Sequence, residues 1–289
     1  MTKIKHAYLI VTNKCNLRCP FCFRNKAQYE SEGILPLELF GKLSELGIRS
    51  LSITGGEPFL NTKLPLLLDA IKSYDFFIEI STNGFLCNRY IIDYLKFDVL
   101  SISMDSLFVQ KLFNYRERSY EKIYKILKNK ISCSVPIQLY YIFLNLRQEE
   151  IEKVLEIQNL GIMPVFLPIS LTPKILKKIK LGHNQYTNFL RQDIELLHKY
   201  RILTQNMLDR LNKFLLCIEK PECFKEGDVC RIVTDSIVID MKGTVYPCFY
   251  QNPIGSLWNT ENLNTNRTNF LRTSGNCSML SANCALLYF

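Results

Sequence analysis

Six short runs rich in β-branched and aromatic residues alternate with helical patterns along the chain, and this order constrains the fold most. Strands are expected at His6–Thr12, Arg49–Thr54, Phe76–Thr82, Val99–Ser103, Ile137–Phe143 and Met163–Ile169. Helices are expected at Leu37–Leu46, Lys63–Ser73, Arg89–Lys96, Tyr120–Lys130 and Glu149–Leu160. Repeated strand–helix units of this length favour a parallel sheet. The sequence therefore predicts an α/β fold, a (β/α)6 sheet curled into a partial TIM-type barrel.

The pattern changes toward the end of the chain. A long amphipathic stretch, Tyr186–Ile218, is followed by short strands, turns and closely spaced cysteines. Ser236–Asp240 and Thr244–Pro247 flank a Lys-Gly pair, which predicts a hairpin. We therefore expect a barrel domain over residues 1–220 and a small auxiliary domain over residues 221–289.

Composition excludes several classes of protein. With 289 residues, 47% of them hydrophobic, the chain can bury a full core. The formal net charge is +9, but no basic stripe interleaves with stacking aromatics, so a nucleic-acid partner is disfavoured. The apolar run Tyr8–Val11 is too short for a signal peptide or a membrane span. We expect a cytoplasmic protein without a membrane partner.

Three of the eleven cysteines lie together in the loop that leaves the first predicted strand. Cys15, Cys19 and Cys22 are spaced C-x3-C-x2-C. A [4Fe–4S] cluster held by three thiolates keeps one iron open for another ligand. A structural zinc site is the alternative, but it usually requires a fourth nearby ligand. The spacing favours an iron–sulfur cluster with an open iron.

Polar segments follow three further strands at the point where each strand ends. They contain Gly55-Gly56-Glu57-Pro58, then Thr82 and Asn83, then Ser103 and Asp105. Active sites of curled parallel sheets gather at the carboxyl ends of the strands. We therefore expect these side chains to share one site. The alternatives are plain turns at the glycines and Asn83, and a helix N-cap at Asp105.

The cysteine loop resembles the signature of the radical S-adenosylmethionine (radical SAM) superfamily, C-x3-C-x-aromatic-C, with Phe21 as the aromatic residue. The resemblance implies a [4Fe–4S] cluster whose open iron binds S-adenosylmethionine. Gly55, Gly56, Glu57 and Pro58 match the Gly-Gly-Glu-Pro motif that holds the amino group of S-adenosylmethionine in that family. The resemblance also implies that Thr82, Asn83, Ser103 and Asp105 line the ribose and methionine part of the cofactor site.

A second set of cysteines, Cys230, Cys248, Cys277 and Cys284, could hold a further cluster. Cys230, Gly243 and Cys248 resemble the opening of the twitch region, the short form of the SPASM domain. The last cysteines of the full SPASM pattern are missing, which favours one auxiliary [4Fe–4S] cluster over two. Cys217 and Cys223 could replace a tail ligand or pack as small apolar residues.

The resemblance implies an enzyme that makes a 5′-deoxyadenosyl radical and abstracts hydrogen from a natural-product precursor. The precursor is a ribosomal peptide or a sugar-like small molecule, the change is expected to be oxidative, and the reductant is a flavodoxin or ferredoxin. Because Cys15 lies near the start of the sequence, a peptide would be recognised directly or through a separate carrier. The alternative is a non-catalytic iron–sulfur redox sensor or assembly module, which leaves Gly55-Gly56-Glu57-Pro58 unexplained.

Overall fold

The computed structural model describes residues 4–22, 33–87, 96–114, 119–128, 135–169, 171, 173–219, 235–249, 252–263 and 266, and the structural statements below concern these residues. Of the predicted helices, Arg89–Lys96 lies outside this part of the chain, apart from Lys96.

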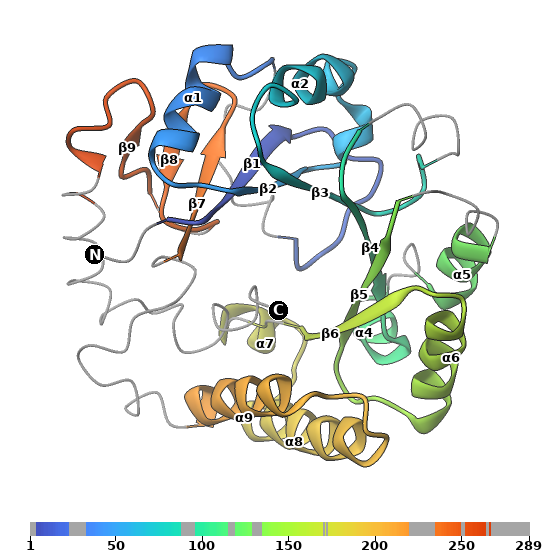
Figure 1. Cartoon of the computed structure of the whole chain (residues 1–289). Helices are drawn as coiled ribbons and strands as arrows, with labels where there is room; N and C mark the ends of the chain where they lie inside the picture. The colour runs from blue at the N-terminus through green and yellow to red at the C-terminus, as the bar shows by residue number, and fades with distance from the viewer. Residues whose placement is uncertain are drawn as a thin grey trace.

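A parallel sheet forms the centre of the molecule (Figure 1). Its first six strands are β1 His6–Thr12, β2 Ser50–Gly55, β3 Phe77–Thr82, β4 Val99–Asp105, β5 Ile137–Phe143 and β6 Met163–Pro168. Neighbours along the chain pair in parallel, in the order β6-β5-β4-β3-β2-β1. The six predicted strands and the α/β class are thereby confirmed, with β1 and β5 at the predicted bounds.

The sheet continues beyond β1 into the C-terminal region. Strand β7 (Ser236–Asp240) pairs in parallel with β1, and β8 (Thr244–Tyr246) pairs antiparallel with β7. The two-residue strand β9 (Gly255–Ser256) completes the nine-stranded sheet. The predicted hairpin is confirmed. It extends the barrel sheet, and the division at residue 220 stays a prediction.

Helices connect the strands and cover the sheet. They are α1 Leu37–Glu45, α2 Leu64–Ile71, α4 Leu107–Leu112, α5 Tyr120–Lys128, α6 Gln148–Asn159, α7 Pro173–Lys178, α8 His183–Lys199 and α9 Gln205–Glu219, with a 3-10 turn η2 at Pro58–Leu60. The amphipathic stretch Tyr186–Ile218 is divided between α8 and α9. Arg201 lies between them with a φ of 54°, a left-handed conformation that ends a helix.

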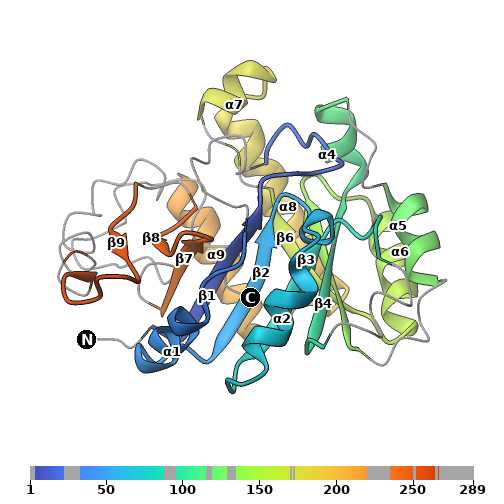
Figure 2. The same cartoon turned by 90° about the horizontal axis from the view of Figure 1, so that it is seen from above.

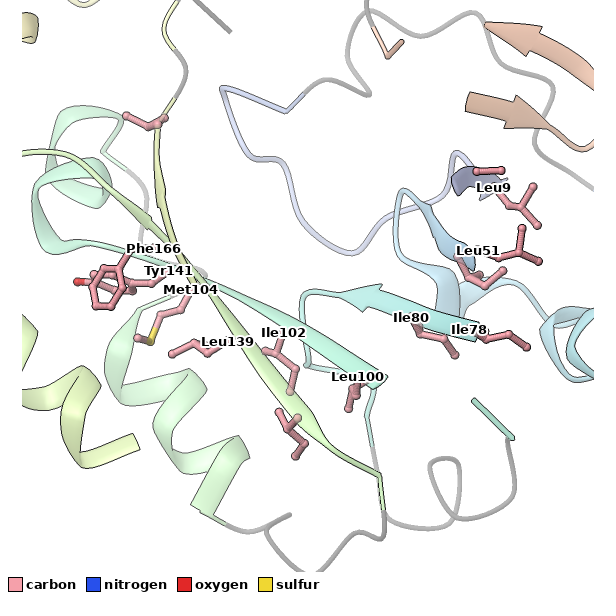
Figure 3. Packing of buried hydrophobic residues seen from close by; sticks show 14 of the residues in the cluster. Leu9, Leu51, Ile78, Ile80, Leu100, Ile102, Met104, Leu139, Tyr141 and Phe166 are labelled. Atoms are coloured by element: carbon pink, nitrogen blue, oxygen red, sulfur yellow. The ribbon is translucent and has the colours of Figure 1, made fainter. Parts of the chain in front are cut away.

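Alternate residues of each strand face opposite sides of the sheet. On the outer face, Leu9, Leu51, Ile80, Ile102 and Leu139 lie in one buried hydrophobic cluster (Figure 3). Helices α1 and α2 lie outside β1–β3, and α5 and α6 lie outside β4–β6 (Figure 1). The other face, which we call the lumen, carries Tyr8, Ser52, Glu79, Ser101 and Tyr140. Apolar outer residues therefore hold the helices, and polar residues line the lumen.

The loop after β1 carries the cysteines. Figure 2 shows this loop beside α4, and the ring centroids of Phe21 and Phe113, the C-cap residue of α4, lie 5.3 Å apart. No helix among the described residues has both the length and the apolar character needed to cross a membrane.

Candidate functional site

Backbone hydrogen bonds join the cysteine loop to the end of β2. The N–H of Gly56 donates to the carbonyl of Thr12 at 2.6 Å, and the N–H of Glu57 donates to the carbonyl of Lys14 at 2.8 Å. The start of the cysteine loop is thus paired, residue by residue, with the Gly-Gly-Glu segment. The two motifs form one local structure.

Glycine is required on the β2 side of this contact. Gly55 has a φ of +140°, and a Cβ atom there would overlap the carbonyl oxygen of Thr12. A Cβ atom on Gly56 would overlap the carbonyl oxygen of Lys14. Glycines often let the backbone approach a ligand closely. Here the close approach is to the backbone of the cysteine loop itself.

Glu57 is fully buried, and its carboxylate accepts three hydrogen bonds. Oε1 accepts from the Thr82 hydroxyl at 2.7 Å and from the backbone N–H of Phe59 at 3.2 Å. Oε2 accepts from the backbone N–H of Asn83 at 2.9 Å. Burial raises the pKa of Glu57, and the hydrogen bonds from Asn83, Thr82 and Phe59 oppose that rise. The carboxylate therefore ties the end of β3 to the end of β2.

Asn83 extends this connection to the cysteine loop. Its side-chain amide donates to Oδ1 of Asn16 at 2.7 Å and lies 4.0 Å from Sγ of Cys15. Its own Oδ1 accepts from the N–H of Phe85 at 3.1 Å, which fixes the side chain in an Asx turn. The predicted site residues of β2, β3 and the cysteine loop thus meet at one edge of the sheet.

The three cysteines of the loop are all half-buried. The N–H of Cys22 donates to the carbonyl of Cys19 at 3.2 Å, which closes a turn, and Sγ of Cys15 accepts from the N–H of Leu17 at 3.4 Å. Among the described residues, no three His, Cys, Asp or Glu side chains converge as ligands of a single metal ion would. Three thiols that each bind a different iron of one cluster need no such convergence. The donor set therefore fits a cluster site.

Ser103 and Asp105 occupy alternate positions at the end of β4, between residues whose side chains pack in the outer core. Asp105 is buried, and its carbonyl accepts from the side chain of Gln110 at 2.7 Å. The N-cap of α4 is Ser106, whose hydroxyl accepts from the N–H of Val109 at 3.4 Å. The alternative role of Asp105 as that cap is therefore wrong, because the next residue fills it.

Only one cysteine of the second set lies in the described part of the chain. Cys248 is buried just after β8, whereas Cys230, Cys277 and Cys284 lie outside the described residues, as does Cys223. The hairpin that leads to Cys248 is well defined. Asp240 Oδ1 accepts from the N–H groups of Lys242 and Thr244, at 3.0 and 2.9 Å, around Gly243 with its φ of +79°.

Sequence reasoning missed two groups of polar residues. One is Asn16, whose bond to Asn83 links the cysteine loop to β3. The other is the lumen carboxylate of Glu79 on β3, which accepts hydrogen bonds from Ser52 on the adjacent strand β2 and from Tyr140 on β5. Glu79 could have been found from the sequence, because it is a charged residue between Ile78 and Ile80 in a predicted strand.

Comparison with known sequences identifies the family. The sequence model described as the radical SAM superfamily matches residues 9–157, which contain every described residue of the site at the edge of β1–β4. GTP 3′,8-cyclase of Campylobacter jejuni subsp. doylei is 30% identical over 166 residues, which are 53% of this chain and 52% of the relative. The enzyme of the same name from Chlorobaculum tepidum is 27% identical over 164 residues, 53% of this chain and 50% of the relative. The chain thus spans about half the length of these curated relatives.

Solved structures share the fold. SuiB of Streptococcus suis bound to precursor peptide SuiA superposes with a TM-score of 0.67 at 17% identity, over 93% of this chain and 66% of SuiB. The anSMEcpe structure with bound AdoMet and Cp18Cys peptide gives a TM-score of 0.58 at 19% identity, over 94% and 83% of the two chains. Identities this low establish the architecture alone. The family match covers more than half of the chain and shows that this protein belongs to the radical SAM superfamily.

Proposed function

We propose that Cys15, Cys19 and Cys22 hold the [4Fe–4S] cluster on which S-adenosylmethionine is cleaved. The observation that carries the proposal is the hydrogen-bonded chain from Glu57 through Asn83 to the cysteine loop. It brings a carboxylate, an amide and three thiols to the carboxyl end of the parallel strands, where such folds bind their ligands. Cluster and S-adenosylmethionine together supply a 5′-deoxyadenosyl radical when one electron breaks the sulfur–C5′ bond.

Glu57 is proposed to receive the amino group of S-adenosylmethionine. Its Oε2 accepts one hydrogen bond from the described chain, and a carboxylate oxygen has room for two. Burial strengthens a charge-assisted bond to an ammonium group, and Thr82 and Phe59 hold the carboxylate in place. Gly55, Gly56 and Pro58 support this group by shaping the turn, and Phe21 packs the cysteine loop against α4. Ser103 and Asp105 are proposed to line the ribose side.

The radical is proposed to abstract hydrogen from a natural-product precursor, a peptide or a sugar-like small molecule, within the lumen below the site. The substrate radical then loses one electron and one proton, so that the change is an oxidation. A flavodoxin or ferredoxin supplies the electron for the cleavage step. The structural neighbours SuiB and anSMEcpe were each solved with a bound peptide, which supports a peptide as one substrate class.

A second, auxiliary [4Fe–4S] cluster on Cys230, Cys248, Cys277 and Cys284 is proposed as the acceptor of the substrate electron. The support is the hairpin of β7 and β8. Cys248 follows β8, β8 pairs with β7, and β7 pairs with β1 of the barrel sheet. Two four-iron clusters correspond to about eight irons per chain after anaerobic reconstitution. A content near four irons would remove the auxiliary assignment.

The cleavage step is tested by anaerobic reconstitution with iron and sulfide, followed by dithionite and S-adenosylmethionine. We expect 5′-deoxyadenosine from the wild-type chain and from Cys87→Ser, which replaces a buried cysteine outside the loop and keeps a donor to the Thr82 hydroxyl. The variants Cys15→Ala, Cys19→Ala and Cys22→Ala should form none. Absence of 5′-deoxyadenosine from iron-loaded wild-type protein would overturn the proposal and favour a non-catalytic redox role.

A further inference from the structure

A cavity of about 750 Å³ lies in the lumen at the end of the barrel opposite the cysteine loop. It is lined by the first residue of each of the six parallel strands: His6, Ser50, Phe77, Val99, Ile137 and Met163. The interior of a closed barrel is normally filled by bulky branched side chains. Here serine, tyrosine and glutamate occupy many of those inward positions, and the space between them stays open. The cavity therefore combines largely apolar walls with a few polar side chains.

Glu79 is the carboxylate of this cavity, and four hydroxyls hold it. Ser52 Oγ donates to Oε2 at 2.5 Å, while Ser101 Oγ, the Tyr140 hydroxyl and Ser81 Oγ donate to Oε1 at 2.5, 2.6 and 3.5 Å. Ser81 belongs to β3 itself, and the other donors come from β2, β4 and β5, so the carboxylate is fixed from four strands. Glu79 precedes Thr82 by three residues on β3, which places it about 10 Å below the edge of the cofactor site.

The described neighbours do not neutralise the charge of Glu79. Burial lowers the pKa of His6 to about 4, so its ring is neutral near pH 7. Burial, with the nearby Glu79 charge, raises the pKa of Tyr8 and Tyr140, so both phenols are also neutral. Arg210 of α9 lines the same cavity and has a contact of its own. A carboxylate in such a space is stabilised by a cation that enters it.

His6 lines the same cavity. Its Nδ1 lies 2.7 Å from Ser50 Oγ, and its Nε2 is buried with no hydrogen-bond partner among the described residues. Buried ring nitrogens nearly always have a partner, so an orphan in a cavity wall indicates a ligand that supplies one. The neutral ring can accept or donate a hydrogen bond there, depending on its tautomer. Glu79 and His6 thus offer one anionic and one neutral contact.

We propose that this end of the lumen binds a primary ammonium group of the substrate, held by Glu79 Oε2, with a hydroxyl or amide of the same molecule at His6 Nε2. Glu79 and His6 are positioning residues, about 10 Å along the strand from the cofactor edge. The inference rests on the proposed function in treating the lumen as the substrate site. The shared chemistry is an alkylammonium, which an amino alcohol or a lysine side chain supplies.

Saturation-transfer NMR on the reconstituted full chain, without reductant, tests the site with four small molecules. Ethanolammonium represents an amino alcohol, and n-butylammonium represents a lysine side chain. Tetramethylammonium keeps the charge but has no N–H donor, and ethylene glycol keeps the size but has no charge. We expect at least one primary ammonium to bind the wild-type chain and the two controls to bind at least about tenfold more weakly. Tighter binding of ethanolammonium would indicate an amino alcohol as the substrate group, and tighter binding of n-butylammonium would indicate a lysine side chain.

Glu79→Gln should weaken that binding about tenfold or more, because a charge-assisted hydrogen bond becomes a neutral one. The matched control Glu45→Gln, at an exposed position of α1, should leave it unchanged. Equal binding by wild type and Glu79→Gln would overturn the inference, as would failure of both primary ammonium ions to bind the wild-type chain. If Glu79→Gln does not fold, the wild-type chain alone tests the inference. Tetramethylammonium that binds the wild-type chain as tightly as the primary ammonium ions would then overturn it. Because binding is measured without reductant, loss of 5′-deoxyadenosine formation and loss of ammonium binding are separate results.

Discussion

The hydroxyl of Thr82 donates to Oε1 of Glu57 at 2.7 Å and accepts from the N–H of Gly84 at 3.0 Å. The second bond fixes the direction of the first, because an oxygen that already accepts from Gly84 turns its own proton toward Glu57. The ends of β2 and β3 are thereby joined through one oriented side-chain contact. The orientation of the Glu57 carboxylate follows from it.

Glu57→Gln should therefore destabilise the folded chain. The amide oxygen can still accept from Thr82 and Phe59, but the amide N–H₂ then faces the N–H of Asn83, so two donors meet. An unsatisfied buried donor costs about 1–3 kcal/mol. Urea unfolding measures the change in free energy of unfolding, and Glu45→Gln at an exposed position is the control. Equal midpoints for Glu57→Gln and wild type would contradict the network.

Gly56→Ala should prevent the cysteine loop from holding iron. The added Cβ would overlap the carbonyl of Lys14, so the loop would have to move away from β2. Iron per chain after reconstitution is the measurement, and we expect a clear loss. Gly41→Ala is the matched control, since its Cβ would lie 3.7 Å from the Tyr74 hydroxyl in ordinary contact, and alanine favours the helix by about 1 kcal/mol. Full iron content in Gly56→Ala would show that the glycine contact does not matter.

Because Asp193 is buried, we expect the free energy of unfolding to depend on pH. Its carboxylate accepts from the N–H groups of Asn145 and Leu146, at 2.7 and 2.6 Å, and burial raises its pKa to about 7 despite these bonds. The folded chain thus keeps this proton over a range in which the unfolded chain loses it. The contribution of Asp193 to stability is complete below about pH 4 and is lost as the pH rises through about 7.

Asp193→Asn removes that titration. The free energy of unfolding of Asp193→Asn minus that of the wild type should increase as the pH rises from about 4 to about 7. Loss of a hydrogen-bond acceptor could lower the stability of the variant by the same amount at every pH, and this would not change the trend. Unfolding by urea at a series of pH values gives the comparison, with exposed Asp209→Asn reporting the effect of removing a surface charge. Two curves that stay parallel over this range would rule out a raised pKa for Asp193.

The local features of the fold followed from the sequence, because each strand is a short apolar run bounded by turn residues. β1 and β5 begin and end where the pattern predicts. The cysteine spacing and Gly55-Gly56-Glu57-Pro58 likewise marked the site, since each is a contiguous motif. Features that depend on contacts distant in sequence did not follow. The pairing of β7 with β1 joins segments more than two hundred residues apart.

The lumen carboxylate shows the same limit within the site. Ser52, Ser101 and Tyr140 each belong to a different strand, and only the register of the sheet turns their hydroxyls toward Glu79. Sequence alone predicts which side chains of one strand share a face of the sheet. It does not predict which side chains from four different strands come into contact. The reason for the glycines was hidden likewise, because the clash that excludes a Cβ involves Thr12 and Lys14 of another segment.

Cys15, Cys19 and Cys22 are proposed to hold a cluster with an iron open to S-adenosylmethionine. Electron paramagnetic resonance of the dithionite-reduced, reconstituted protein detects whether S-adenosylmethionine binds this iron. We predict a signal whose g-values change when S-adenosylmethionine is added, and loss of that signal in Cys15→Ala. A cluster spectrum from the wild-type chain that is identical with and without S-adenosylmethionine would show that no iron of the cluster is open to it.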